Sequence, residues 1–303
     1  MKTSDLPWLS PYLQPMLRCP LCGKKSWEQI YDLGALKVQK CCPCRMMFLD
    51  PFLGPEGMKK IFSSPELLAQ VNRFLADYGS EETWATPRTL AIYRQVMDRI
   101  TARSGRPGKI LDIGCGRGAF LQCAAGRGWK AFGLEPNCPN RQELETKYGI
   151  RVFDEDFLAG TILEKDFDAV SLWDLIEHVP DPSAWVRRCK SFLRPGGILI
   201  MATPNHFSLL DSLAEGAYRL SGGRFTYALK KLYTLDHALF FTHHTLARLL
   251  ERENFPVVSM VKVNTDLSRY PTGFLFRVFA ECLLGAAGLL GFQNRVIAIT
   301  GGE

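Results

Sequence analysis

The sequence predicts an α/β fold: a seven-stranded, mostly parallel sheet with helices on both faces, preceded by a small cysteine-rich segment. Three observations predict it. After residue 105, short apolar runs alternate with helical stretches, glycine-containing turns separate them, and paired cysteines gather before residue 50. A chain of 303 residues can form one large domain with a small appendage.

Composition and charge narrow the class of protein. Hydrophobic residues make up 47% of the chain and charged residues 22%, which is typical of an ordered globular domain and does not indicate disorder. The formal charge of +6 would tolerate an anionic substrate or nucleic acid without requiring either. The first seven residues carry no apolar run of signal-peptide length, so we expect a cytoplasmic protein.

Residues 1–57 are predicted to form a zinc-ribbon-like segment. Cys19 and Cys22 form one C-x2-C pair, Cys41 and Cys44 form a second, and this spacing suits four thiolates around one structural zinc ion. Cys42 is the spare thiol of the second pair. An iron–sulfur cluster is a lesser alternative. A slight excess of basic residues leaves RNA binding open, although few aromatic residues accompany them.

Residues 58–104 are predicted to be a helical linker or lid, because apolar residues recur there at intervals of three and four. The main domain follows over residues 105–303. Its seven expected strands are 109–113, 129–134, 150–153, 167–173, 197–202, 257–263 and 295–300.

Two further segments have alternative interpretations. An insertion at about 204–236 is longer than a crossover needs, so it is either a lid over the site or a solvated helical connection. The apolar stretch 274–292 is interrupted by Arg277, Glu281 and glycines, which argues against a membrane span. It is either a packed amphipathic helix or a lip that contacts a lipid-like substrate or a bilayer.

The stretch from Asp112 to Gly118 is the candidate cofactor loop. It follows a strand and opens a helix, and its glycines allow a ligand to approach the backbone closely. The same glycines, with Glu135 downstream, also fit a dinucleotide site. Asp112 favours a cationic ligand, since its carboxylate would repel a pyrophosphate.

The motifs ILDIGCGRGAF at 110–120 and GLEP at 133–136 resemble those of the class I, Rossmann-like S-adenosylmethionine-dependent methyltransferases. The segments FDAVSLWDLIEHVPDP, LRPGGILIMATPN and HALFFTHHTLARLLERENF follow in the order of the branch similar to ubiquinone-pathway O-methyltransferases. The N-terminal ribbon also looks like one found on some methyltransferases of biosynthetic clusters.

The resemblance implies a set of cofactor-binding residues. Asp112 and the loop from Gly114 to Gly118 would hold the methionine part, and Glu135 would accept hydrogen bonds from the ribose hydroxyls. Asp156 and Phe157 would contact adenine, with a helix cap as the alternative for Asp156. Trp173 and Asp174 would stand beside the methyl group, with core packing as the alternative for Trp173. The complete set is Asp112, Gly114, Cys115, Gly116, Gly118, Glu135, Pro136, Asp156, Phe157, Trp173 and Asp174.

Two histidines are candidate bases. His178, in the Glu-His pair after the fourth strand, is the first candidate, and His237 is the second. Structural hydrogen bonding is the alternative for His178. His243 and His244 are expected to lie at a helix start that Thr242 caps.

The sequence therefore predicts a methyltransferase that acts on a hydroxyl or activated carbon of a small molecule, such as a sugar, a quinone-like or a lipid-linked acceptor. Three alternatives stay open: an RNA methyltransferase that docks through the ribbon, an inactive ribbon-bearing binding protein, and a dinucleotide oxidoreductase.

Overall fold

The computed structural model describes residues 7–34, 36–71, 85–160, 162–267 and 274–301. The predicted helical stretch before the main domain is present as α1 (Pro55–Phe62), α2 (Pro65–Val71) and α4 (Pro87–Ser104). The part of that prediction over residues 72–84 lies outside the described residues.

The main sheet has the seven predicted strands, in the spatial order β12-β13-β10-β9-β6-β7-β8. β6, β7, β8, β9 and β10 run parallel to one another, and β13 runs antiparallel to both of its neighbours, β10 and β12. Strands buried on both faces read as continuous apolar runs, which is why the sequence located them. Their bounds are β6 (Lys109–Ile113), β7 (Lys130–Leu134), β8 (Arg151–Phe153), β9 (Phe167–Trp173), β10 (Leu193–Pro204), β12 (Val257–Val263) and β13 (Arg295–Thr300).

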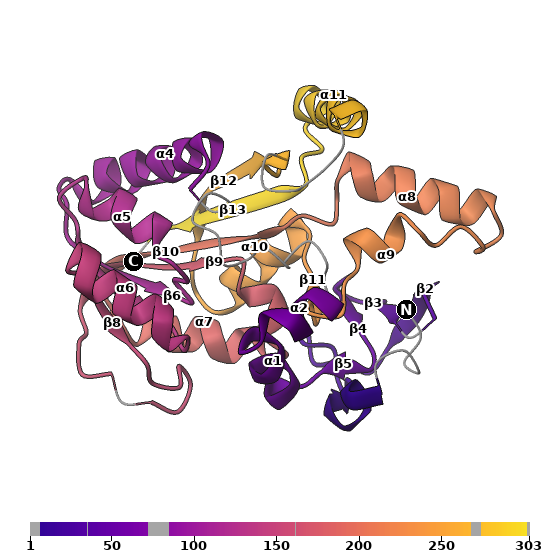
Figure 1. Cartoon of the computed structure of the whole chain (residues 1–303), viewed down its shortest axis with the longest axis horizontal. Helices are drawn as coiled ribbons and strands as arrows, with labels where there is room; N and C mark the ends of the chain where they lie inside the picture. Colours follow the sequence, from indigo (N-terminus) through magenta and orange to yellow (C-terminus); the bar gives the residue numbers. More distant parts are fainter. Residues whose placement is uncertain (1–6, 35, 72–84, 161, 268–273, 302–303) are drawn as a thin grey trace.

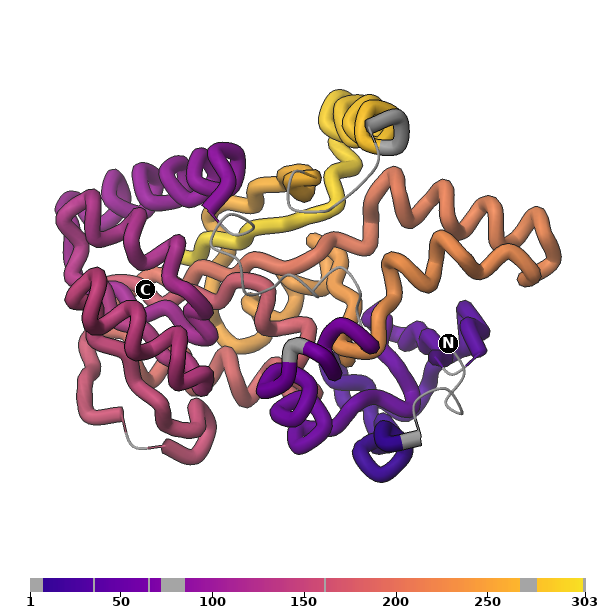
Figure 2. Tube along the Cα trace, viewed as in Figure 1, coloured from indigo at the N-terminus to yellow at the C-terminus, as the bar shows by residue number. Residues whose placement is uncertain are grey.

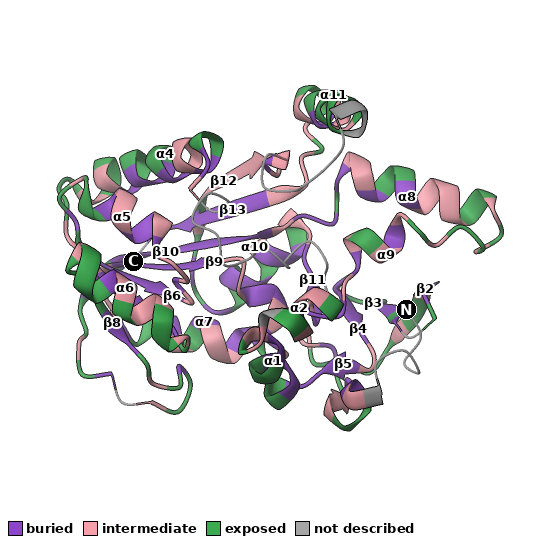
Figure 3. Ribbon diagram, viewed as in Figure 1, coloured by how far each residue is buried: buried purple, intermediate pink, exposed green. Residues whose placement is uncertain are grey.

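Helices cover both faces of this sheet (Figure 1). On one face α4 and α5 pack against a cluster that includes Tyr93, Phe120 and Ile110. On the other face α7 and α10 contact each other. Figure 3 shows the strands buried between these layers. The covering helices are α5 (Ala119–Ala125), α6 (Cys138–Tyr148), α7 (Pro182–Lys190) and α10 (His243–Arg252).

The N-terminal segment is joined to the main domain through a shared sheet. β2 (Trp27–Asp32), β3 (Lys37–Cys41) and β4 (Met47–Leu49) form an antiparallel sheet whose fourth strand is β11 (Leu239–Phe240). β1 (Leu13–Gln14) pairs separately with β5 (Phe52–Leu53). The predicted boundary near residue 57 stays a prediction, but the strand pairing of β4 with β11 crosses it.

The insertion at 204–236 holds α8 (Leu209–Leu220) and α9 (Leu229–Leu232), which extend from the sheet and lie beside the ribbon strands (Figures 1 and 2). α11 (Phe274–Leu290) precedes β13. Within the described ranges, no helix is both long and apolar enough to cross a bilayer.

Candidate functional site

The predicted cofactor loop lies at the carboxyl end of β6, near the centre of the sheet. Gly116 (φ 53°) and Gly118 (φ 73°) adopt left-handed backbone conformations that glycine tolerates best. A Cβ at Gly118 would lie 2.3 Å from Leu144, whereas a Cβ at Gly116 would meet nothing within 4 Å. The loop therefore packs on one side and leaves the backbone at Gly116 open to a ligand.

Glu135 is tied to this loop. The N–H of Gly116 donates to its Oε2 at 2.8 Å, and the N–H of Asn137 donates to Oε1 at 2.9 Å. Burial raises the pKa of Glu135, and these two donors oppose that effect. An ionised carboxylate has lone pairs beyond the two bonds it accepts here, so it can also accept from the two hydroxyls of a ribose.

Asp112 is buried at the end of β6 and accepts a hydrogen bond from the hydroxyl of Ser171 at 2.6 Å. Burial raises its pKa to about 8, with a smaller contribution from the charge of Glu135. Within the described ranges no cationic side chain pairs with it. The site thus holds a buried acid that a ligand's ammonium could neutralise.

The other residues predicted around the adenosine differ in burial and in the groups that they contact. The Cys115 thiol is buried, which raises its pKa, and Pro136 is exposed. Asp156 accepts the N–H groups of Leu158 and Ala159 at 2.9 and 2.7 Å, as a capping residue does. Phe157 is buried against Trp185, with ring centroids 4.6 Å apart. Contact of Asp156 and Phe157 with adenine stays a prediction.

Trp173 is the last residue of β9 and Asp174 follows it, and their side chains have different kinds of partner. The Trp173 ring packs against Tyr93 at 4.7 Å and Phe120 at 5.0 Å, on the α4 face. Asp174 has a left-handed backbone (φ 51°), and its carboxylate pairs with Arg295 at 2.5 Å. Burial by itself would lower the pKa of Arg295, but the charge of Asp174 and the hydrogen bond to it outweigh burial and raise that pKa. The ion pair fixes Asp174 at the sheet edge.

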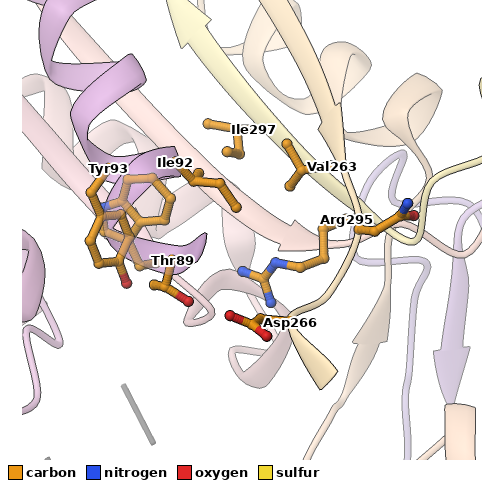
Figure 4. Close-up of a pocket in the computed structure, with 9 residues that line it drawn as sticks. Thr89, Ile92, Tyr93, Val263, Asp266, Arg295 and Ile297 are labelled. Atoms are coloured by element: carbon orange, nitrogen blue, oxygen red, sulfur yellow. The ribbon is translucent and has the colours of Figure 1, made fainter. Parts of the chain in front are cut away.

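A small pocket lies behind Trp173, between α4 and the strands β12 and β13. Its cavity volume is about 20 Å³, room for a water molecule and not for a cofactor. Figure 4 shows Tyr93 and Thr89 on one side of it and Arg295 and Asp266 on the other. The lining residues are Thr89, Ile92, Tyr93, Trp173, Val263, Asn264, Asp266, Arg295 and Ile297.

The predicted histidines come together beside Glu177. Donor atoms of Glu177, His178 and His237 lie within 4.8 Å of one another, although His237 is distant in sequence. Burial raises the pKa of Glu177 to about 7, and its Oε2 accepts from the Thr203 hydroxyl at 2.9 Å. Burial lowers the pKa of His237 to about 4. Such a group can bind a polar substrate and could also hold a divalent cation.

His178 is oriented by the backbone. Its Nδ1 lies 2.6 Å from the carbonyl oxygen of Asp236. A carbonyl only accepts hydrogen bonds, so Nδ1 carries the proton and the neutral ring presents Nε2 as an acceptor. The ring also contacts Phe62 of α1 at 5.3 Å, so the helical linker borders this group.

Sequence reasoning missed His206, which follows β10. It is buried and lies 3.0 Å, through Nδ1, from Asp211 at the start of α8. Thr242 caps α10 as predicted, which places His243 and His244 in its first turn. In the sequence, Ser208 and Asp211 read as the ordinary capping residues of a helix start, so nothing separate pointed to His206.

The four predicted metal ligands form one cluster. The sulfur atoms of Cys19, Cys22, Cys41 and Cys44 lie within 4.8 Å of one another. Cys42 is exposed and outside the group, as its register predicts. A hydrogen bond from Cys44 lowers the pKa of Cys19 to about 5, which favours a thiolate. Four thiolates so arranged suit a tetrahedral zinc ion.

The cysteine cluster is fastened to the main domain by α10. Arg248 donates to the carbonyl oxygen of Cys44 at 3.3 Å, and Arg252 donates to that of Leu21. Together with the pairing of β4 and β11, these bonds attach the ribbon close to His237.

Known proteins resemble this chain in sequence and in fold. A family model described as a methyltransferase domain matches residues 87–260. The ubiquinone biosynthesis O-methyltransferase of Xanthomonas campestris pv. campestris (strain B100) is 35% identical over 126 residues, 39% of this chain and 52% of that protein. The one from Coxiella burnetii (strain RSA 331 / Henzerling II) is 27% identical over 179 residues, 53% of this chain and 71% of that protein. The match to the Xanthomonas relative thus spans about half of its length.

Two solved structures share the fold. The 1,6-didemethyltoxoflavin-N1-methyltransferase of Burkholderia thailandensis, with 1,6-didemethyltoxoflavin and S-adenosylhomocysteine bound, superposes with a TM-score of 0.53 at 16% identity, over 86% of this chain and 97% of that one. The magnesium protoporphyrin IX methyltransferase of Synechocystis PCC 6803, with S-adenosylhomocysteine bound, gives 0.50 at 16% identity, over 80% and 97%. The family model covers more than half of the residues, including the glycine loop and Glu135, so the chain belongs to the methyltransferase domain family.

Proposed function

We propose that this chain transfers a methyl group from S-adenosylmethionine to a hydroxyl or activated carbon of a small molecule, such as a sugar, quinone-like or lipid-linked acceptor. One observation carries the proposal. Within the described part of the chain, Glu177 Oε1 and His237 Nδ1 are buried without hydrogen-bond partners. Buried polar atoms normally have hydrogen-bond partners. A polar substrate that accepts the methyl group at this sheet edge would supply the partners that these two atoms lack.

In this proposal some residues of the site bind S-adenosylmethionine and others border the methyl acceptor. When bound, S-adenosylmethionine supplies a methyl group on a sulfonium, which a nucleophile can displace in line. Asp112 and the open backbone at Gly116 would hold its methionine part, and Glu135 its ribose. Asp174, fixed by Arg295, would border the acceptor. His178 and His237 remain candidate bases, and the pKa of His237 keeps that ring neutral near pH 7.

We expect S-adenosylmethionine binding to release up to one proton at pH 7. Asp112 is mostly protonated below its pKa of about 8, and the ligand's ammonium would favour the ionised carboxylate. Affinity should therefore rise with pH up to about 8. Calorimetric titrations in phosphate and in Tris, whose ionisation enthalpies differ, measure the released proton. In Asp112→Asn, the release should fall to the small contribution of Glu135; an unchanged release in that variant would contradict the assignment.

The activity itself is tested by release of S-adenosylhomocysteine from S-adenosylmethionine with the full chain. The acceptor panel should contain nucleotide-linked sugars, catechols and polyprenylated phenols. The proposal expects release above the acceptor-free blank with at least one class. Blank-level release with every class, from protein that binds S-adenosylmethionine, would overturn the acceptor assignment.

The ribbon is proposed to bind structural zinc. Its bonds to Arg248 and Arg252 support a role in building the site rather than in docking RNA. α11 exposes Phe279, Leu289 and Leu290, which supports the second of its two interpretations, a contact with a lipid-like substrate or a bilayer. A cytoplasmic location stays a prediction.

A further inference from the structure

His206 and Asp211 form a second acid–histidine pair outside the group of Glu177, His178 and His237. His206 is 9% exposed, and its Nδ1 lies 3.0 Å from Asp211 Oδ1. Within the described ranges, its Nε2 is buried and has no hydrogen-bond partner. A buried ring nitrogen without a hydrogen-bond partner is unfavourable unless a ligand forms that hydrogen bond.

Asp211 determines which nitrogen of His206 carries the proton. Its carboxylate also accepts from the hydroxyls of Ser208 and, at 3.4 Å, Tyr233. Held by these donors, the carboxylate acts as an acceptor, so the proton of neutral His206 sits on Nδ1. The unpaired Nε2 then offers a lone pair on the side of the ring away from Asp211.

The ring is fixed in place. Its centroid lies 4.9 Å from that of Tyr233 and 5.0 Å from that of Phe240, and its backbone N–H donates to the carbonyl oxygen of Phe241 at 2.8 Å. A base held in this way needs little reorganisation when it accepts a proton.

The position of His206 at the sheet edge would allow it to contact a methyl acceptor bound there. It follows β10 by two residues, and β10 is the direct neighbour of β9, whose end leads to His178. Adjacent strands lie about 4.8 Å apart. Phe240 contacts the rings of both His206 and His237. His206 thus borders the same sheet edge on the side away from the cofactor loop.

Among these three histidines of the described chain, only His206 has a carboxylate as the partner of its Nδ1. Its partner is a carboxylate at 3.0 Å, whereas Nδ1 of His178 faces a neutral carbonyl oxygen. The carboxylate of Asp236 lies 3.6 Å from His237, whose burial disfavours protonation. A hydrogen-bonded carboxylate that orients a histidine and stabilises its charged form is the arrangement used in hydrolase triads.

We propose that His206, oriented by Asp211, accepts the proton of an acceptor hydroxyl during methyl transfer. The inference rests on the proposed function and identifies the acceptor as a hydroxyl compound. The O–H bond breaks and its proton passes to Nε2 of His206. The oxygen forms a bond to the methyl carbon, while the carbon–sulfur bond of the sulfonium breaks and its electron pair stays on sulfur. Asp211 balances the charge of the imidazolium.

The kinetic test compares His206→Gln, Asp211→Asn and the control His244→Gln, which changes an exposed imidazole. His206→Gln should lower kcat by about 100-fold or more, with unchanged affinity for S-adenosylmethionine. Its rate should rise with pH over the range where the wild-type rate is level, because hydroxide must replace the lost base. Asp211→Asn should show a smaller loss, and His244→Gln none. The titratable side chains beside His206, which also contribute to this pH profile, are Asp211, Tyr233 and His237. A wild-type rate and pH profile in His206→Gln would overturn the proposal.

A second measurement separates this inference from the proposed function. Correlation of imidazole ¹⁵N and ¹H resonances in the full chain, without any acceptor, should place the proton of neutral His206 on Nδ1. Asp211→Asn should remove that preference. A proton on Nε2 would overturn the inference even if methyl transfer is found. With the proton on Nδ1, failure of the whole acceptor panel would instead refute the proposed function on which this inference rests.

Discussion

Glu135→Gln is expected to weaken S-adenosylmethionine binding by about 100-fold, since hydrogen bonds to a charged group contribute about 1.5–3 kcal/mol. The glutamine amide has one acceptor oxygen and an NH₂ group. It would place a donor against the N–H of either Gly116 or Asn137, which now donate to Oε2 and Oε1 at 2.8 and 2.9 Å. It would also lose the remaining acceptor capacity that the ribose needs. Calorimetric titration measures the loss.

Glu251→Gln provides the matched control, because that carboxylate is exposed on α10. Its affinity should equal that of the wild-type chain. The account would be wrong about Glu135 if both variants bound S-adenosylmethionine equally well while remaining folded by circular dichroism.

Cys41→Ser is expected to abolish stoichiometric zinc and to lower the melting temperature by at least about 10 °C. Binding of structural zinc contributes about 10–16 kcal/mol in small domains, and about 1 kcal/mol shifts the melting temperature of a larger domain by roughly 2–4 °C. The loss should spread beyond the ribbon, because β4 pairs with β11 next to His237. Metal content by plasma mass spectrometry and thermal unfolding test this.

Cys42→Ser is the control, since Cys42 is exposed and outside the cluster. It should keep about one zinc per chain and melt within about 1 °C of the wild type. Purified wild-type chain without zinc, melting like Cys41→Ser, would contradict a structural metal.

The features of the fold and the site that depend on short sequence patterns were predictable from the sequence. The seven strands appear as apolar runs because they are buried, and the C-x2-C register alone distinguishes Cys41 and Cys44 from Cys42. The family resemblance supplied Glu135, whose bond to Gly116 then appeared in the structure. These features are encoded in neighbouring residues.

Features that depend on distant segments were not predictable in the same way. β11 has only two residues, too few for a periodicity, and its partner β4 lies far away in sequence. The neighbourhood of His178 and His237 depends on the same long-range folding. His206 becomes notable only once its ring is seen to be buried beside Asp211 with Nε2 unpaired.

The most direct test of the central claim is calorimetric titration of the full chain with S-adenosylmethionine and, in parallel, with NAD. The loop glycines alone would suit either ligand, whereas buried Asp112 favours a cation. The account predicts saturable, one-to-one binding of S-adenosylmethionine and at least 100-fold weaker binding of NAD. Tighter binding of NAD would contradict it.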